Sequence, residues 1–90
     1  MDATYNLSFG TTIIALKNGF KVTRKGWNGK GMWLKLQIPD EHSKMTRPYI
    51  YMCLPKGSTN QFGDSAKELD RIPWLASQTD ILAEDWSIID

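Results

Sequence analysis

The sequence is poor in the residues that carry most catalytic and metal chemistry. Its 90 residues include one cysteine and one histidine, so an intrachain disulfide is excluded and Cys53 alone supplies no zinc site. No apolar run is long enough to span a bilayer, and the N-terminus lacks the basic and apolar segments of a signal peptide. We therefore expect a cytoplasmic protein without membrane contact, metal or cofactor.

The motifs of common enzyme classes are also missing. There is no phosphate-binding P-loop, no G-x-S-x-G nucleophile and no metal-ligand spacing. We expect His42 to be solvent-exposed and Cys53 to be a packed thiol, because no motif surrounds either of them. An enzyme needs a positioned acid, base or nucleophile, so the sequence predicts a binding protein rather than an enzyme.

Charge of one sign is missing from a long stretch in the first half of the chain and from its last fifteen residues. Between Ala3 and Pro39 there are six basic residues and no acidic one, whereas residues 76–90 hold four acidic residues and no basic one. This polarity steers an anionic ligand to the first half, or lets a basic face of one subunit meet an acidic face of another. The net charge of +1 makes nucleic acid an improbable general partner, because backbone binding favours a basic surface.

What is present predicts a single α+β domain spanning residues 1–90, with a small antiparallel sheet of about four or five strands. A long N-terminal helix is expected over residues 7–19, where Ser8 is the N-cap and Gly19 the left-handed C-cap. Its inward face would consist of Phe9, Ile13, Leu16 and Phe20. Such a short chain has a thin core, so oligomerisation is a reasonable route to more burial.

Alternating apolar and polar residues predict the strands, with extended segments at 20–24, 32–38, 49–54, 71–75 and 85–89. Phe20 and Val22 are expected to face inward, as are Met32, Leu34, Leu36 and Ile38 in the second strand. Pro73 would keep its short strand at a sheet edge or end.

The segment from Val22 to Trp33 combines a cationic strand end with a glycine-rich loop. Glycines allow a ligand to approach the backbone closely, while the indole of Trp27 offers a flat face and one N–H donor. Together with Arg24 and Asn28, these features suit an anionic ligand with a ring system. The alternative is a tight hairpin whose tryptophan packs into a small core.

Residues 77–80 form the capping-box pattern that opens a short second helix. The first-turn amides of such a helix carry positive partial charge and attract anions. Alternatively, Ser77 and Asp80 satisfy those amides themselves.

Three blocks of the chain resemble a small phage and prophage family long catalogued as a domain of unknown function. They are Phe9-Gly10 with residues 15–19, residues 22–32 and the very specific block at residues 73–86; residues 39–70 match only loosely. Characterised members of this family include the second type of Thoeris anti-defence protein. The resemblance implies a sponge that sequesters a cyclic ADP-ribose isomer made by a bacterial TIR-domain protein. It also implies a homo-tetramer with the signal between subunits and, in some members, cyclic oligonucleotides at a separate site.

Carried over to this chain, the resemblance implies ligand contacts by two groups of residues. Trp27 and Trp74 would stack on bases or ribose, Arg24 and the backbone amides of residues 77–79 would hold the pyrophosphate, and Asn28 with Gln78 would bond ribose or base edges. The matching positions are Arg24, Trp27, Asn28, Trp74, Ser77, Gln78, Thr79 and Asp80. Two other functions remain open at this point: a protein-interaction inhibitor of a host defence enzyme, or a single-stranded nucleic-acid-binding module.

Overall fold

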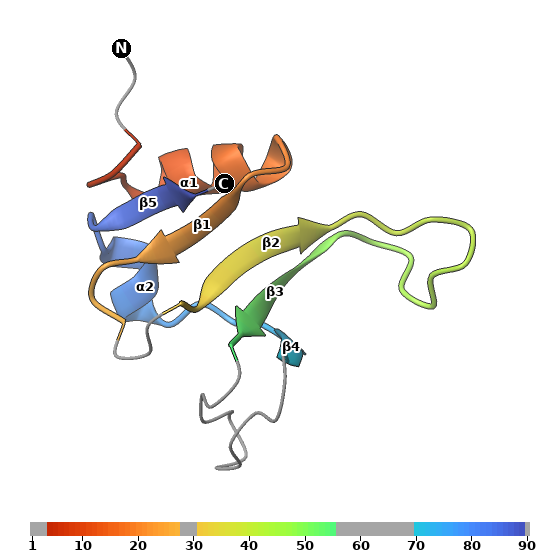
Figure 1. The fold of residues 1–90 in the computed structure, drawn as a ribbon. Helices are drawn as coiled ribbons and strands as arrows, with labels where there is room; N and C mark the ends of the chain where they lie inside the picture. Colours follow the sequence, from red (N-terminus) through yellow and green to blue (C-terminus); the bar gives the residue numbers. More distant parts are fainter. Residues whose placement is uncertain (1–3, 28–30, 56–69, 90) are drawn as a thin grey trace.

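A computed structural model of the chain describes residues 4–27, 31–55 and 70–89 (Figure 1). The elements are α1 (Phe9–Lys17), β1 (Lys21–Arg24), β2 (Trp33–Gln37), β3 (Tyr49–Leu54), β4 (Asp70–Pro73), α2 (Gln78–Leu82) and β5 (Trp86–Ile89). The predicted α+β fold, with an N-terminal helix and a short C-terminal helix, is confirmed.

The strands form one antiparallel sheet in the order β4-β3-β2-β1-β5. The chain therefore inserts its first strand between its second and its last. Val22 in β1 lies opposite Leu34 on one side and Ile88 on the other. Pro73 ends the edge strand β4, as its missing N–H donor predicts.

Helix α1 begins and ends where its capping residues predict. The Ser8 hydroxyl accepts a hydrogen bond from the Thr11 amide at 3.3 Å, and Gly19 has a φ of +88°. The expected inward position of Phe20 is wrong, because this side chain is 48% exposed. The helix ends at Lys17 and the chain reverses at Gly19, so Phe20 lies beyond the packed face of α1.

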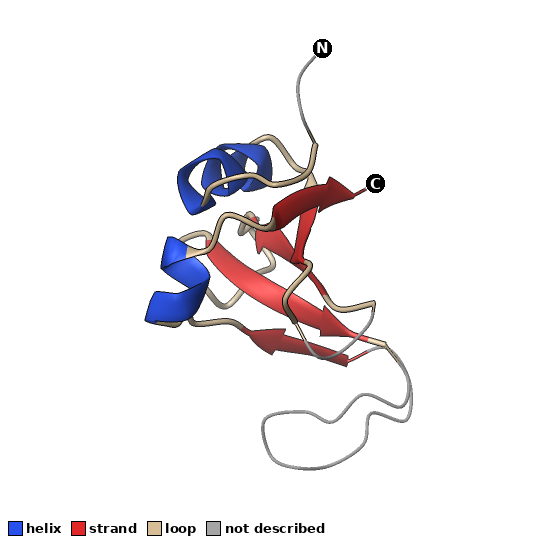
Figure 2. Cartoon of the chain, turned by 90° about the vertical axis from the view of Figure 1, so that its left-hand side faces the viewer, coloured by secondary structure: helices blue, strands red, loops and turns tan. Residues whose placement is uncertain are grey.

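Both helices lie on the same face of the sheet (Figure 2). Helix α1 packs against β1, β2 and β5. The buried residues of the core come from these elements and from the segment before α1: Leu7, Ala15, Leu16, Val22, Leu34 and Trp86. Thr12 is buried among them, and its hydroxyl donates to the Ser8 carbonyl at 2.8 Å.

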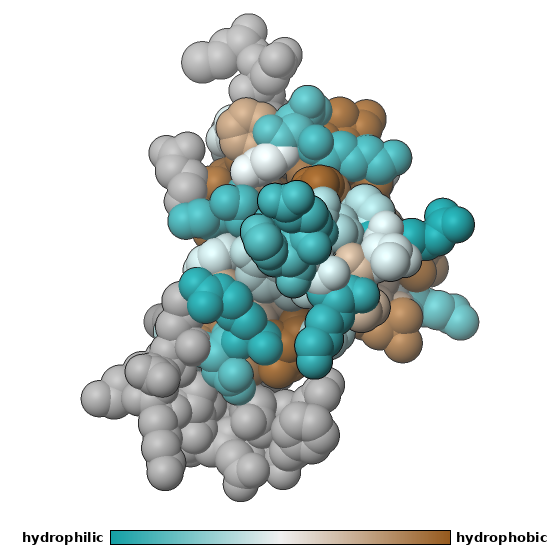
Figure 3. All heavy atoms as spheres, turned by 90° about the vertical axis from the view of Figure 1, so that its right-hand side faces the viewer, coloured by the Kyte–Doolittle hydropathy of each residue, from teal (hydrophilic) through white to brown (hydrophobic). Residues whose placement is uncertain are grey.

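The connection between β2 and β3, residues 38–48, projects from the body of the molecule (Figure 1). Ile38 was expected to face the core but is 60% exposed, because β2 ends at Gln37 and the chain leaves the sheet there. Figure 3 views the molecule from the side on which this connection projects in Figure 1. Hydrophilic residues lie at the front of this view, and hydrophobic residues lie above and below them. The predicted exposure of His42 is confirmed.

Within the described ranges, neither helix combines the length and apolarity required to cross a bilayer. Cys53 is fully buried, which confirms the packed thiol. In the same ranges no three histidine, cysteine, aspartate or glutamate side chains come together as metal ligands would.

Candidate functional site

The two segments predicted to bind a ligand come together in the structure. Trp27, from the loop after β1, lies with its ring centroid 6.4 Å from that of Trp74, which follows β4. Trp86 contacts both, at 5.3 and 6.0 Å, and Phe9 of α1 completes the group. We call Phe9, Trp27, Trp74 and Trp86 the aromatic cluster. Edge-to-face and tilted pairs of this kind add about 0.5–1.5 kcal/mol each to the burial of the rings.

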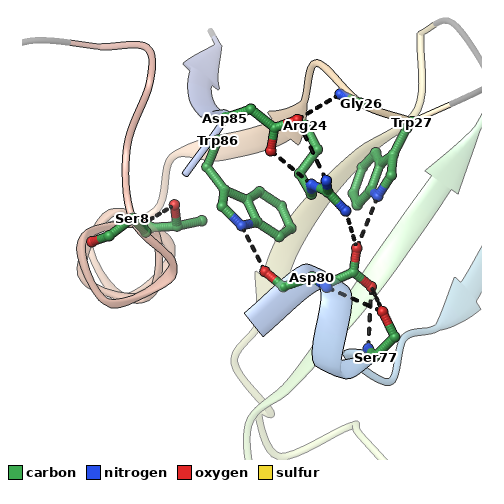
Figure 4. Close-up of polar contacts among 9 residues, drawn as sticks. Ser8, Arg24, Gly26, Trp27, Ser77, Asp80, Asp85 and Trp86 are labelled. Atoms are coloured by element: carbon green, nitrogen blue, oxygen red, sulfur yellow. Dashed lines mark hydrogen bonds and ion pairs between the residues drawn. The ribbon is translucent and has the colours of Figure 1, made fainter. Parts of the chain in front are cut away.

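An ion-pair network lies against this cluster (Figure 4). The Arg24 guanidinium donates from Nε to Asp85 Oδ1 at 2.8 Å and from Nη1 to Asp80 Oδ1 at 2.8 Å. Its third nitrogen, Nη2, lies 3.4 Å from Asp85 Oδ2. The arrangement follows from strand pairing, since Arg24 stands opposite Trp86 in β5 and therefore beside the residue that precedes that strand.

Asp80 connects the network to helix α2. Its Oδ1 accepts from Arg24 and from the Trp27 indole at 3.2 Å, and its Oδ2 accepts from the Ser77 amide and hydroxyl at 3.1 and 2.9 Å. A carboxylate has about four acceptor positions, and these four bonds fill them. The predicted capping box is complete: the Ser77 hydroxyl accepts from the Asp80 amide, and the Asp80 carboxylate accepts from the Ser77 amide.

The backbone carbonyl of Asp80 is also engaged, because it accepts from the Trp86 indole at 3.0 Å. One residue thus orients two members of the aromatic cluster, Trp27 through its side chain and Trp86 through its main chain. A buried indole N–H left without an acceptor is costly, so these bonds fix where each ring lies.

Gly26 is a loop position at which a side chain does not fit. Its amide donates to Asp85 Oδ2 at 2.8 Å. A Cβ here would lie 2.8 Å from that oxygen and 3.0 Å from Arg24 Nη2. Glycine is therefore needed for close approach of the loop backbone to the ion pair.

The network shifts the ionisation of its members. Burial raises the pKa of Asp80, but the bonds from Arg24, Trp27 and Ser77 outweigh it and the net pKa is lowered. The bond from Arg24 lowers the pKa of Asp85 against a smaller opposing effect of burial. Bonds to Asp85 and Asp80 raise the pKa of Arg24. All three groups are therefore charged at neutral pH.

These shifts predict acid sensitivity. A carboxyl whose pKa is lowered in the folded state contributes stability above its unfolded pKa of about 3.9, and that stability is lost as pH falls through the folded value. We expect the urea midpoint to fall steadily below about pH 4. In an Asp85→Asn variant the fall should be shallower. A midpoint constant from neutral pH to about pH 3, or an equally steep fall in the variant, would contradict the role of the network.

The structure groups five of the predicted site residues: Arg24, Trp27, Trp74, Ser77 and Asp80. Gln78 and Thr79 lie exposed in the first turn of α2. Asn28 lies outside the described residues. Arg24 and Asp80 are bonded within the protein, so the side chains that remain directed to solvent belong to α2 and to the half-buried Trp27 and Trp74.

A groove of about 560 Å³ adjoins the aromatic cluster, between α1 and strands β2 and β3. Trp74 belongs to both the cluster and the groove, and Lys17 and Tyr49 add a cation and a phenol to otherwise apolar walls. Its volume falls within the range of small-ligand sites. Sequence analysis did not select Lys17 or Tyr49, because only the packing of α1 on the paired strands brings them near Trp74.

Fold and site define a small α+β protein in which an internal ion-pair network orients a cluster of tryptophans beside an apolar groove. Residues 7–89 match the family model of the Thoeris anti-defense 2-like domain, Tad2-like. The chain is also 37% identical over 87 residues to Thoeris anti-defense 2 of Bacillus phage SP01, covering 92% of this chain and 94% of that protein. The chain therefore belongs to the Thoeris anti-defense 2-like family, and this membership assigns it a role in phage anti-defence.

Proposed function

We propose that this protein is a sponge that binds a cyclic ADP-ribose-type immune signal and holds it intact, so that the Thoeris effector is not activated. Family membership supports an action on the Thoeris signalling pathway. The observation that carries the molecular part of the proposal is the convergence of Trp27 and Trp74 next to a groove of ligand size.

In this proposal the ligand is held by Trp74 and by the exposed polar residues of α2. A base or ribose enters the groove and packs on the Trp74 ring. Stacking of one base on an aromatic side chain contributes about 1–3 kcal/mol to binding. Gln78 and Thr79 bond its polar edges, and Lys17 on the groove wall pairs with a phosphate. Arg24 and Asp80 act as positioning residues, because their bonds fix Trp27 and the first turn of α2.

We further propose that the protein works as a homo-oligomer, a tetramer, with the signal enclosed between subunits. Leu75 precedes α2 and Leu82 is its last residue, and they are 92% and 77% exposed. Large apolar side chains beside a binding site favour coverage by a partner. A second copy of the chain would cover them and close the site from water.

The proposed function is tested by recovery of the ligand. Purified protein is incubated with cyclic ADP-ribose isomers made by a TIR-domain enzyme, freed of unbound ligand and heat-denatured. We expect release of the ligand with unchanged mass and in stoichiometric amount. Recovery of a hydrolysed product would identify an enzyme, and absence of any bound ligand would refute the sponge.

Substitution of Trp74 tests the site. We expect Trp74→Leu to weaken binding of the cyclic signal by about tenfold or more, the equivalent of one lost stacking contact. Trp74→Phe should retain part of the affinity. Trp33→Leu, on the opposite face of the sheet, is the matched control and should bind as the wild type does. Calorimetry measures all three, and equal affinity of Trp74→Leu and wild type would remove the groove from the site.

A further inference from the structure

The sheet has a second face, on the side away from both helices (Figure 2). Side chains alternate between the faces of a strand, so this open face is formed by the neighbours of the core residues. Its strand positions in the described residues carry no carboxylate. They do carry three cations and three aromatic rings: Lys21, Lys35, Arg71, Trp33, Tyr49 and Tyr51.

The cations of the open face are spread over three strands of the sheet. Val22 stands opposite Leu34, so Lys21 and Lys35 are neighbours across β1 and β2. Arg71 stands opposite Cys53. Cys53 also stands opposite Trp33 in β2, so Arg71 lies on the same face of the sheet as the two lysines. Like charges facing each other on adjacent strands are destabilising, and a bound anion would offset that repulsion.

The aromatic rings lie among these charges. Trp33 and Tyr51 form an edge-to-face pair with centroids 6.5 Å apart, and the Lys21 ammonium lies 4.7 Å from the Trp33 ring centre. A hollow of about 190 Å³ is lined by Tyr49, Tyr51 and Arg71 together with residues of β2 and β4. Flat rings next to cations on an open sheet are what protein surfaces use to stack unpaired bases and hold their phosphates.

The geometry points to the open face as a binding surface for single-stranded nucleic acid. The cations belong to β1, β2 and β4, and strands lie about 4.8 Å apart, so the charges extend across the sheet further than one mononucleotide reaches. Successive phosphates of one strand reach all three. The rings give bases a surface on which to stack, and an acidic peptide has no bases that would use it. Tyr49 borders both this surface and the groove. The three cations and Trp33 lie outside the groove and α2, so the inference does not depend on the proposed capture of a cyclic signal.

Fluorescence polarisation with labelled single-stranded oligouridylate of about ten nucleotides tests this inference. Affinity is measured from about 50 to 200 mM salt. With three phosphates neutralised we expect log K to fall with log salt at a slope of about −2, since each phosphate on a single strand contributes about −0.7. Lys35→Gln should make the slope shallower by about 0.7. Lys44→Gln, in the exposed connection between β2 and β3, is the matched control and should leave the slope unchanged.

A second pair of variants distinguishes the contribution of stacking from that of charge. The same pair distinguishes the open face from the groove beside Trp74. Trp33→Leu should weaken binding of the oligonucleotide by about tenfold at every salt concentration, with binding of the cyclic signal retained. Trp74→Leu should weaken binding of the cyclic signal and leave binding of the oligonucleotide unchanged. The inference is overturned if no saturable binding occurs at low salt, if uridine monophosphate or oligoglutamate competes as well as the oligonucleotide, or if Lys35→Gln leaves the slope unchanged.

Discussion

Asp80→Ala is expected to lower the free energy of unfolding by about 3–5 kcal/mol, the cost of removing one partner from a buried, hydrogen-bonded ion pair. The substitution deletes all four bonds to the carboxylate. It leaves the Trp27 indole without its acceptor and opens the capping box of α2. The total free energy of unfolding of a small domain is only about 5–15 kcal/mol, so the loss approaches the stability of the whole fold.

Urea denaturation measures this effect, with Asp80→Asn as the conservative variant and Glu84→Gln as the matched control. Glu84 is exposed one turn beyond Asp80, so its substitution should change stability by no more than about 0.5 kcal/mol. Asp80→Asn keeps one accepting oxygen and should lie between the two. If Asp80→Ala has the same urea midpoint as the Glu84→Gln control, the Asp80 carboxylate is not the centre of the network.

Trp86→Ala is expected to cost a similar amount, about 3–5 kcal/mol, by emptying the centre of the core. The Trp86 side chain is fully buried and contacts Phe9, Trp27 and Trp74. Removing it leaves a cavity bordered by three other rings, and their relaxation would also displace the walls of the proposed ligand site.

A second substitution separates packing from hydrogen bonding at this position. Trp86→Phe keeps a ring but loses the donor to the Asp80 carbonyl, so about 1–3 kcal/mol should be lost through the unpaired carbonyl and the smaller volume. Thermal unfolding followed by near-UV circular dichroism compares the variants. If Trp86→Ala keeps the wild-type melting temperature, the aromatic cluster does not stabilise the fold.

Features set by neighbouring residues could be predicted from the sequence. The Ser8 cap, the Gly19 reversal and the capping box at Ser77 each depend on a few consecutive residues, and each is confirmed. Strand alternation depends on local pattern too, and it placed Val22 and Leu34 correctly in the core. The errors at Phe20 and Ile38 occur at the ends of elements, where the chain leaves the regular geometry on which the pattern rests.

Features set by distant residues could not be predicted. The sequence contrasts a basic first half with an acidic last segment, which suggested ligand steering or contact between subunits. In the structure, some of these opposite charges neutralise each other within the protein, because Arg24 pairs with Asp80 and Asp85. No local pattern specifies that partnership. It requires β1 to pair with β5, which joins opposite ends of the sequence.

The pairing of β1 with β5 also determines how late in folding the sheet can be completed. Leu7 exchanges main-chain bonds with Trp86 at 2.9 and 3.2 Å, and Thr4 accepts from the Ile88 amide at 2.8 Å, so β5 has early residues on both sides. A nascent chain still lacking residues 86–89 has neither its central indole nor its second partner for β1. Such long-range closure slows folding, because β1 and β5 must meet across most of the sequence before the sheet is complete.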